Sequence, residues 1–295
     1  MHRVTFALVV AVAAAFASSA NASQLIDRNA NGVKLAVNAK GEAMLAYTVA
    51  GKAKHVLAWG AVNAVAPSRG GKQVELNLDY AGGWGKYHKN YWQTFGTACG
   101  AYDGPALAWS VTACKAPDGS YWALQKWQRM LPNYGLAPKP VQAVWELRLS
   151  HWTGDLPQLT ISTDWAWHQW DHLYGTLSYA GSPVFGYKAT SGGNPLDSWG
   201  RNIYVDTFDS SYGKGWHREN SFLTHTNTGV FCYSFNPHGS RPAGRGLKYR
   251  ATVEGPGVTP DVMWQGAAPG VYDRDADLAA NDAIAALGDN LCRAN

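Results

Sequence analysis

Charged residues are scarce in this sequence, and neither sign gathers into a patch. The 295 residues include 25 Lys and Arg against 21 Asp and Glu, with no run of five like charges. A surface that binds the phosphates of nucleic acids or an anionic membrane needs clustered Lys and Arg. We therefore expect no nucleic-acid partner and no polybasic membrane segment.

Long apolar runs are missing after the first 20 residues. The run from Val4 to Ala17 follows the basic residue Arg3 and precedes Ala20-Asn21-Ala22, a pattern typical of a signal peptide cleaved before Ser23. The run is shorter than the roughly 20 apolar residues that span a bilayer. We expect residues 1–22 to be removed and the protein to be secreted, extracellular or periplasmic, with no transmembrane segment.

Cysteines are few, and their number is even: Cys99, Cys114, Cys232 and Cys292. In an exported chain this favours two disulfides, for which three connectivities are possible. We favour Cys99–Cys114, which closes a short loop around a turn, and Cys232–Cys292, which ties the end of the chain to a strand.

Helical periodicity is absent until the end of the chain, which argues against a parallel α/β fold with its crossover helices. Strand-like runs occur at residues 33–37, 43–49, 73–80, 143–149, 230–235 and 248–253, with most of the 32 Gly and 14 Pro between such runs. The sequence therefore predicts an all-β fold, an antiparallel β-sandwich or jelly roll. One helix is predicted over residues 275–287, with acids at its start and Gly288 as its stop.

The predicted organisation is one β-sandwich domain over residues 23–272, followed by a C-terminal helix and tail, 273–295, packed on the sheet. The proline-rich segment 131–140 offers an alternative, a boundary between two β subdomains. The sequence leaves the oligomeric state open.

Motifs for catalysis and cofactors are also missing. No G-x-S-x-G elbow, phosphate loop or dinucleotide fingerprint occurs, so we expect no cofactor. A glycosidase needs two carboxylates across a cleft, and the chain holds five glutamates. Glu146, Asp164 and Glu219 are candidate catalytic acids, because aromatic residues surround most of them. Whether the protein is an enzyme stays open.

Two short segments are similar to metal sites but are incomplete. His168-Gln169-Trp170-Asp171-His172 resembles the H-x-x-E-H motif of inverted zinc peptidases, with Asp in place of Glu and no identified third ligand. Asp273-Arg274-Asp275-Ala276-Asp277 resembles the start of a calcium loop, but acids at a helix N-terminus explain it with fewer assumptions. We expect no metal.

Aromatic residues, by contrast, are abundant, with 14 Trp and 15 Tyr. Indole rings stack well on the C–H faces of sugars. Two clusters alternate aromatic with polar residues and predict ligand binding: Trp84, Tyr87 and Trp92 in a glycine-rich loop, and Trp165, Trp167, His168 and Trp170 further along. The leading hypothesis is a secreted protein that binds a saccharide or cell-envelope glycan.

Two other hypotheses remain. The first is a secreted, glycosidase-like hydrolase that uses paired carboxylates. The second is a structural or protein-interaction role, in which the tryptophans fill the core. The absence of any N-x-S/T site after residue 22 is compatible with a bacterial protein.

Overall fold

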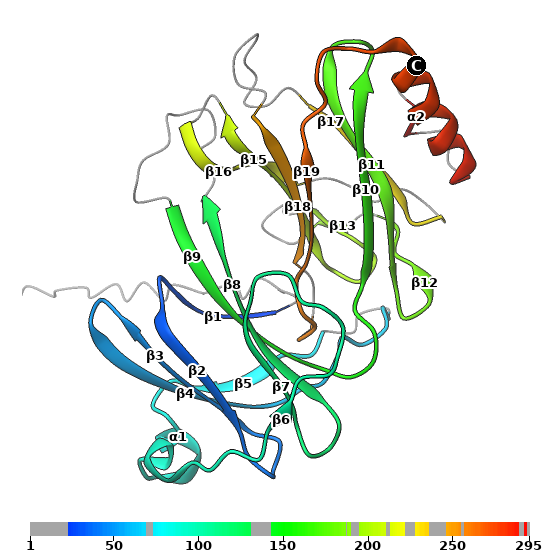
Figure 1. The fold of residues 1–295 in the computed structure, drawn as a ribbon. Coiled ribbons are helices and arrows are strands. Elements are labelled where there is room, and N and C mark those ends of the chain that lie inside the picture. Colours follow the sequence, from blue (N-terminus) through cyan, green and yellow to red (C-terminus); the bar gives the residue numbers. More distant parts are fainter. Residues whose placement is uncertain are drawn as a thin grey trace, which may run out of the picture.

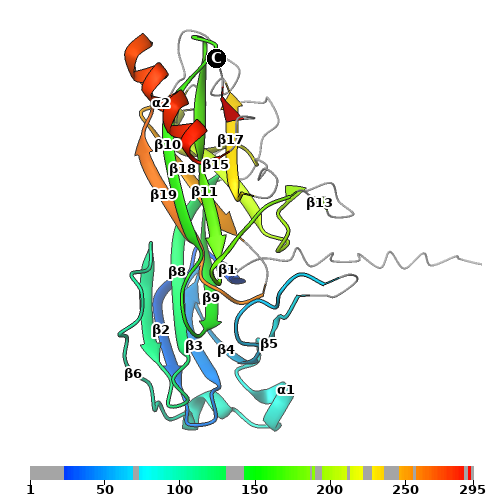
Figure 2. The same cartoon turned by 90° about the vertical axis from the view of Figure 1, so that its right-hand side faces the viewer.

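The computed structural model describes residues 23–68, 73–130, 143–186, 188–189, 195–210, 213–221, 228–235, 246–254, 257–288 and 292–293. The molecule is elongated, with strands β1 to β7 at one end and strands β10 to β19 with helix α2 at the other (Figures 1 and 2). All strand pairs are antiparallel, as the sequence predicts.

The first end is built from two sheets. Sheet A has the order β1-β9-β8-β7-β6, and sheet B has the order β2-β3-β4-β5. The strands of sheet A are β1 Gln24–Arg28, β6 Gly100–Ala101, β7 Ser110–Lys115, β8 Tyr121–Met130 and β9 Ala143–Trp152. Those of sheet B are β2 Asn31–Val37, β3 Ala43–Val49, β4 Lys52–Gly60 and β5 Leu76–Asp79. Two short helices, α1 Trp84–Tyr87 and η1 Tyr91–Thr94, follow β5.

Sheets A and B enclose a common apolar core. Leu45 and Val56 from sheet B are fully buried in one cluster with Trp122, Leu124 and Leu149 from sheet A. In a strand, alternate side chains point to opposite faces, so each strand contributes every second residue to this core. The first end is therefore a two-layer β-sandwich.

The second end has the same plan. Sheet C has the order β10-β11-β12, with β17 paired to β11, and sheet E has the order β16-β15-β18-β19. The strands of sheet C are β10 Gln158–Ala166, β11 Trp170–Tyr179, β12 Ser182–Pro183 and β17 Val230–Phe235. Those of sheet E are β15 Asn202–Ser210, β16 Gly213–Ser221, β18 Lys248–Glu254 and β19 Val262–Ala267. A small pair, β13 Lys188–Ala189 and β14 Pro195–Leu196, lies beside them. Leu173, Phe231, Val205 and Tyr249 meet in the core between sheets C and E.

The predicted boundary at residues 131–140 lies outside the described residues. The strands on either side of it, β8 and β9, pair with each other from Tyr121↔Trp152 to Met130↔Ala143. The chain on both sides of that segment therefore belongs to one sheet. The passage from the first sandwich to the second follows β9, where the chain continues into β10.

Helix α2, Arg274–Ala286, confirms the predicted C-terminal helix. Asp273 caps it, accepting a hydrogen bond from the backbone of Ala276 at 3.0 Å. The acids of the D-x-D-x-D segment thus lie at a helix N-terminus. Gly288 follows the helix with a φ of 83°, a conformation that favours glycine.

Both predicted disulfides are present. Cys99 is joined to Cys114, with Cα atoms 5.7 Å apart, and Cys232 is joined to Cys292, with Cα atoms 5.5 Å apart. The second bond ties the segment after α2 to β17, and Cys292 packs in a small cluster with Tyr174, Val230 and Ile284. The C-terminal helix is therefore fastened to sheet C both covalently and by packing. Among the described residues, no helix is long and apolar enough to span a bilayer.

Opposite the apolar core, the other face of β8 and β9 is buried and charged. Arg148 donates to Glu146 at 2.6 Å and to Glu254, on β18, at 3.1 Å. Arg129 lies 3.3 Å and 3.4 Å from the same two carboxylates. Burial by itself raises the pKa of Glu146, but Arg148, Arg129 and Arg28 outweigh it and hold the pKa at about 2. Glu146 is thus ionised at neutral pH although it lies inside the protein.

The charged contacts continue onto sheet E. Asp206 on β15 pairs with Arg250 at 2.8 Å and with Arg218 at 3.1 Å. Arg250 also donates to the backbone oxygen of Gln128 on β8, at 2.7 Å. These contacts join the two sandwiches through ion pairs. We call the set the ionic layer; its members are Arg129, Glu146, Arg148, Asp206, Arg218, Arg250, Glu254 and Asp261.

Candidate functional site

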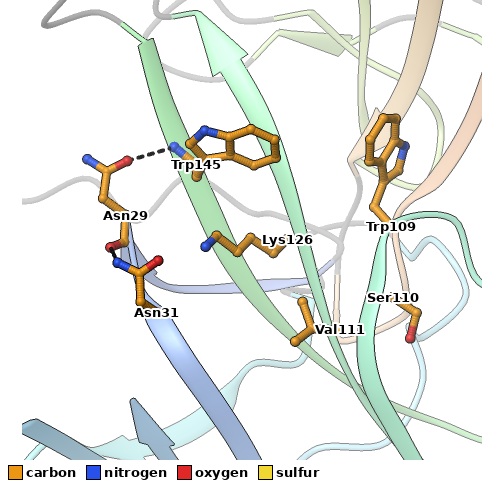
Figure 3. Close-up of a pocket in the computed structure, with 7 residues that line it drawn as sticks. All are labelled: Asn29, Asn31, Trp109, Ser110, Val111, Lys126 and Trp145. Atoms are coloured by element: carbon orange, nitrogen blue, oxygen red, sulfur yellow. Dashed lines mark hydrogen bonds between the residues drawn. The ribbon is translucent and has the colours of Figure 1, made fainter. Parts of the chain in front are cut away.

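Sheet A carries a groove of about 510 Å³, which we take as the candidate site (Figure 3). It is lined by residues from the β1–β2 connection, from the start of β7 and from β8 and β9: Asn29, Asn31, Trp109, Ser110, Val111, Lys126 and Trp145. Pockets that hold small ligands commonly measure 300–1,000 Å³. We call it the Trp109–Trp145 groove.

The alternation of β8 and β9 explains where the groove lies. Leu124, Leu147 and Leu149 point into the core between sheets A and B. In the pairing register, Lys126 lies opposite Leu147, and Gln128 lies opposite Trp145, so Lys126 and Trp145 share the core-facing side of the sheet. These two residues are not part of the core cluster, and Trp145 is 43% exposed. The groove therefore lies on the core-facing side of sheet A, at the end of β8 and β9 that sheet B does not cover.

Trp145 is held in place by the backbone around Asn29. The side-chain oxygen of Asn29 accepts from the backbone N–H of Trp145 at 3.0 Å, and the backbone N–H of Asn29 donates to the carbonyl of Trp145 at 2.7 Å (Figure 3). Asn31 donates to the carbonyl of Asn29 at 3.3 Å. Both asparagines are exposed, so their amides lie at the rim of the groove beside the indole ring.

Lys126 supplies the positive charge of the groove. Its ammonium group donates to the backbone oxygen of Ala30 and lies 5.9 Å from the centre of the Trp145 ring. The backbone N–H of Lys126 donates to the carbonyl of Trp109 at 3.0 Å, which positions the backbone that carries the second ring. Trp109 is 37% exposed. Two indole rings on one rigid sheet thus flank amide and ammonium donors.

The first predicted aromatic cluster lies on α1 and η1. Trp84 is 53% exposed. Trp92 stacks one ring face on His55, with 4.0 Å between ring centres, and the hydroxyl of Tyr87 donates to Glu42. Burial and this hydrogen bond raise the pKa of Tyr87 to about 12. The cluster is partly used in packing, and Trp84 keeps the most accessible ring.

The second predicted cluster lies at the turn between β10 and β11. The indole N–H of Trp165 donates to the carbonyl of Gly270 at 3.1 Å, and His168 stacks on Tyr272 with 4.3 Å between ring centres. Trp170 packs edge-on against Trp167, which is 56% exposed. Trp165 and His168 thus contact the segment before α2, and Trp167 keeps the most accessible ring of the cluster.

The His168–His172 segment is not helical. Asp171 and His172 belong to β11, and His172 is 2.7 Å from Asp164 on the paired strand β10. His168 lies in the preceding turn with its ring on Tyr272. Within the described ranges, no group of three or more His, Cys, Asp or Glu side chains is arranged to hold a metal ion.

The three candidate acids lie on three different sheets. Glu146 on β9 is buried in the ionic layer, Asp164 on β10 is paired with His172, and Glu219 on β16 accepts from Thr207 at 2.7 Å. Burial raises the pKa of Asp164, against the opposing hydrogen bond from His172. A general acid must release a proton near the working pH, and Glu146, with its pKa near 2, holds none at neutral pH.

Neither Trp109 nor Trp145 was singled out by sequence reasoning. Trp145 stands in an alternating run, Ala143-Val144-Trp145-Glu146-Leu147, in which it reads as another core residue. Only the three-dimensional pairing shows that sheet B does not cover this end of the strand. A usable local signal is the pair Asn29 and Asn31, since amide side chains at a strand crossing are typical of exposed turns.

Of the 14 tryptophans, four are buried, five are exposed and the other five are of intermediate exposure. Trp122, Trp127, Trp152 and Trp216 are buried, whereas Trp84, Trp92, Trp109, Trp145 and Trp167 are exposed. Comparisons of the chain with protein-family models, curated proteins and solved structures find no match.

Proposed function

We propose that the protein is exported and binds a saccharide, such as a cell-envelope glycan, in the Trp109–Trp145 groove. The observation that carries the proposal is the pairing of two accessible indole rings with exposed amides around one groove. A pyranose ring presents an apolar C–H face to an indole and hydroxyl groups to amides, so the lining matches both sides of a sugar.

The rigidity of the groove supports the proposal. Trp145 is fixed by two hydrogen bonds to Asn29, and Trp109 by one to β8. A backbone that is already ordered loses little conformational entropy when a ligand stacks on the rings that it carries. Lys126, the charged residue among the lining side chains, suits neutral or acidic sugars better than basic ones.

Export is supported by two independent features. Residues 1–22 have the pattern of a signal peptide, and all four cysteines are joined in disulfides, which persist in oxidising compartments. Export would bring the protein into the compartment where cell-envelope polysaccharides are found.

The proposal can be tested with a glycan array followed by titration of tryptophan fluorescence. We expect the mature protein to retain at least one glycan, and Trp145→Ala to weaken its affinity by about 5- to 150-fold, if a sugar stacks on the indole with the roughly 1–3 kcal/mol that a nucleic-acid base gains on an aromatic ring. Trp84→Ala and Trp167→Ala are the matched controls, because they remove exposed rings from the two other aromatic clusters.

Each outcome has a clear meaning. Loss of binding in Trp145→Ala alone places the ligand in the groove. Loss in Trp84→Ala or Trp167→Ala, with Trp145→Ala unchanged, moves the site to that cluster and contradicts the groove. If no glycan is retained by the wild type, the saccharide proposal itself is wrong.

A further inference from the structure

Ser23, the residue that follows the expected cleavage site, is completely buried. Its hydroxyl donates to the carboxylate of Asp261 at 2.7 Å, and its carbonyl accepts from Arg148 at 3.3 Å. The residue stands directly before β1, against the charged face of β9. The chain start that cleavage creates therefore lies at the edge of the ionic layer, inside the protein.

Asp261 is poorly compensated for a buried carboxylate. Besides Ser23, it accepts from the neutral indole N–H of Trp127 at 3.1 Å. Its one ion pair among the described residues is long, 3.8 Å to Arg148, and Arg148 is already shared between Glu146 and Glu254. Burial raises the pKa of Asp261 to about 6, against the opposing effect of Arg148. A further positive group beside Asp261 is what the site lacks.

The hydroxyl of Ser150 is a second buried polar group close to Ser23. Gln24 pairs with Leu149, so the antiparallel register places Ser23 opposite Ser150, with Cα atoms about 4.5–5.5 Å apart. The hydroxyl of Ser150 is buried and, within the described part of the chain, has no hydrogen-bond partner. A buried hydroxyl without a partner is uncommon in proteins.

We propose that removal of residues 1–22 places the new α-ammonium group of Ser23 in this cluster, as the counter-ion of Asp261 and a hydrogen-bond donor to Ser150. An endopeptidase of the export pathway hydrolyses the Ala22–Ser23 peptide bond with one water. The carboxylate stays on Ala22, and the amine on Ser23 takes up a proton at neutral pH. The inference rests on the proposed export but not on saccharide binding.

Covalent geometry limits where the new charge lies. The nitrogen and Oγ of one serine are at most about 3.7 Å apart, and Oγ is already at 2.7 Å from Asp261. The other charged groups that face this point are Arg148 and Glu146 from β9, Arg129 from β8 and Glu254 from β18. The two arginines are engaged with the two glutamates, which leaves Asp261 for the ammonium group.

The burial of Ser23 also sets the order of events. A peptidase needs several exposed residues around the bond it cuts, and Ser23 is not accessible in the folded protein. Cleavage therefore precedes folding. The mature protein then buries its new N-terminal residue, Ser23, as it folds.

The test uses the chemistry of an N-terminal serine, whose vicinal amino alcohol is oxidised by periodate. N-terminal sequencing of the exported protein should first show Ser23. We expect periodate to oxidise this residue at least about tenfold more slowly in the folded protein than in urea, because oxidation requires local opening. Equal rates in the two states, or a start other than Ser23, would overturn the proposal.

A second measurement isolates the ion pair. Full-length mature protein is prepared with Ser23 first, or with one additional glycine before it, each with and without Asp261→Asn. We expect the glycine to lower the melting temperature by roughly 3–8 °C in the Asp261 protein, and by much less in the Asp261→Asn background. An equal loss in both backgrounds, or none, contradicts the pairing; if Asp261→Asn does not fold, the glycine extension and the periodate rates decide. Glycan binding plays no part in either readout.

Discussion

The two faces of the β8–β9 pair are built from opposite kinds of side chain. On one face, Leu124, Leu147 and Leu149 pack against sheet B in an apolar core. On the other face, Arg148 pairs with Glu146 on its own strand, with Glu254 on β18 and with Asp261, which directly precedes β19. Sandwich formation inside the first end thus relies on apolar burial, whereas the junction with the second end relies on matched charges.

The β8–β9 pair thus contributes to three features: the apolar core, the ionic junction with the second end, and the groove. The apolar face ends where sheet B ends, and there the same alternation exposes Trp145 and Lys126 in the groove. The ionic layer, on the opposite face of β8 and β9, holds these two strands in position against sheet E. Buried ion pairs often add little net stability but can fix one arrangement of their partners, which suits a junction that lies directly behind the groove.

The largest expected effect comes from breaking the ionic layer. Arg148→Met removes the more deeply buried of the two arginines that Glu146 and Glu254 share, and loss of one partner of a buried pair costs about 3–5 kcal/mol. The matched control is Arg28→Met, since Arg28 also pairs with Glu146 but is half exposed, and such pairs contribute about 1 kcal/mol or less. Urea unfolding at pH 7 measures both; similar losses would show that the layer is not a buried charge network.

The apolar face should respond almost as strongly but without regard to charge. Leu149→Ala removes a fully buried side chain from the core between sheets A and B, with an expected loss of about 3–4 kcal/mol in the free energy of unfolding. The loss should be the same at pH 4 and pH 7, because no titratable group changes its partner. A loss that varies strongly with pH would place Leu149 in contact with the ionic layer.

Acid should weaken the part of the ionic layer that depends on Glu146. The pKa of Glu146 is about 2 in the folded protein, below its usual value of 4.5, so its contribution to stability is complete above pH 4.5 and is lost as the pH falls toward 2. The expected contribution is up to about 3 kcal/mol. Measurements of the free energy of unfolding between pH 2 and pH 5, on the wild type and on Glu146→Gln, test this contribution. If the free energy of unfolding falls equally steeply with pH in both proteins, other carboxylates account for the acid sensitivity.

The groove should contribute least to stability. Trp145→Ala removes a partly exposed ring, while the backbone hydrogen bonds to Asn29 remain. We expect a change within about 1 kcal/mol, as is usual for surface positions. Trp122→Ala is the contrasting variant, because that ring is fully buried and its loss costs about 3–5 kcal/mol. Equal costs would mean that Trp145 is a core residue.

Local features of the sequence predicted local structure well. The hairpin of residues 33–37 and 43–49 corresponds to β2 and β3, and the helix and its glycine stop correspond to α2 and Gly288. Both disulfide pairings are confirmed. Strand alternation, helix capping and cysteine spacing are short-range signals, which is why a single sequence can reveal them.

Features that depend on distant partners could not be predicted. Nothing near Glu146 indicates that Glu254 will share Arg148 with it, and nothing near Trp145 indicates that sheet B stops short of it. Trp84 and Trp92 were expected in a glycine-rich loop and lie on two short helices there, with His55 from β4 taking one face of Trp92. Each case depends on which strands become neighbours, and this information is spread over the whole chain.

The most direct test of the groove is an NMR spectrum of the mature protein with ¹⁵N-labelled tryptophan side chains, recorded with and without a glycan that the protein retains. The groove predicts that the indole signals of Trp109 and Trp145 shift, while those of the buried Trp122 and Trp152 stay in place. Shifts confined to Trp84 and Trp92, or to Trp165, Trp167 and Trp170, with Trp109 and Trp145 unmoved, would contradict the account.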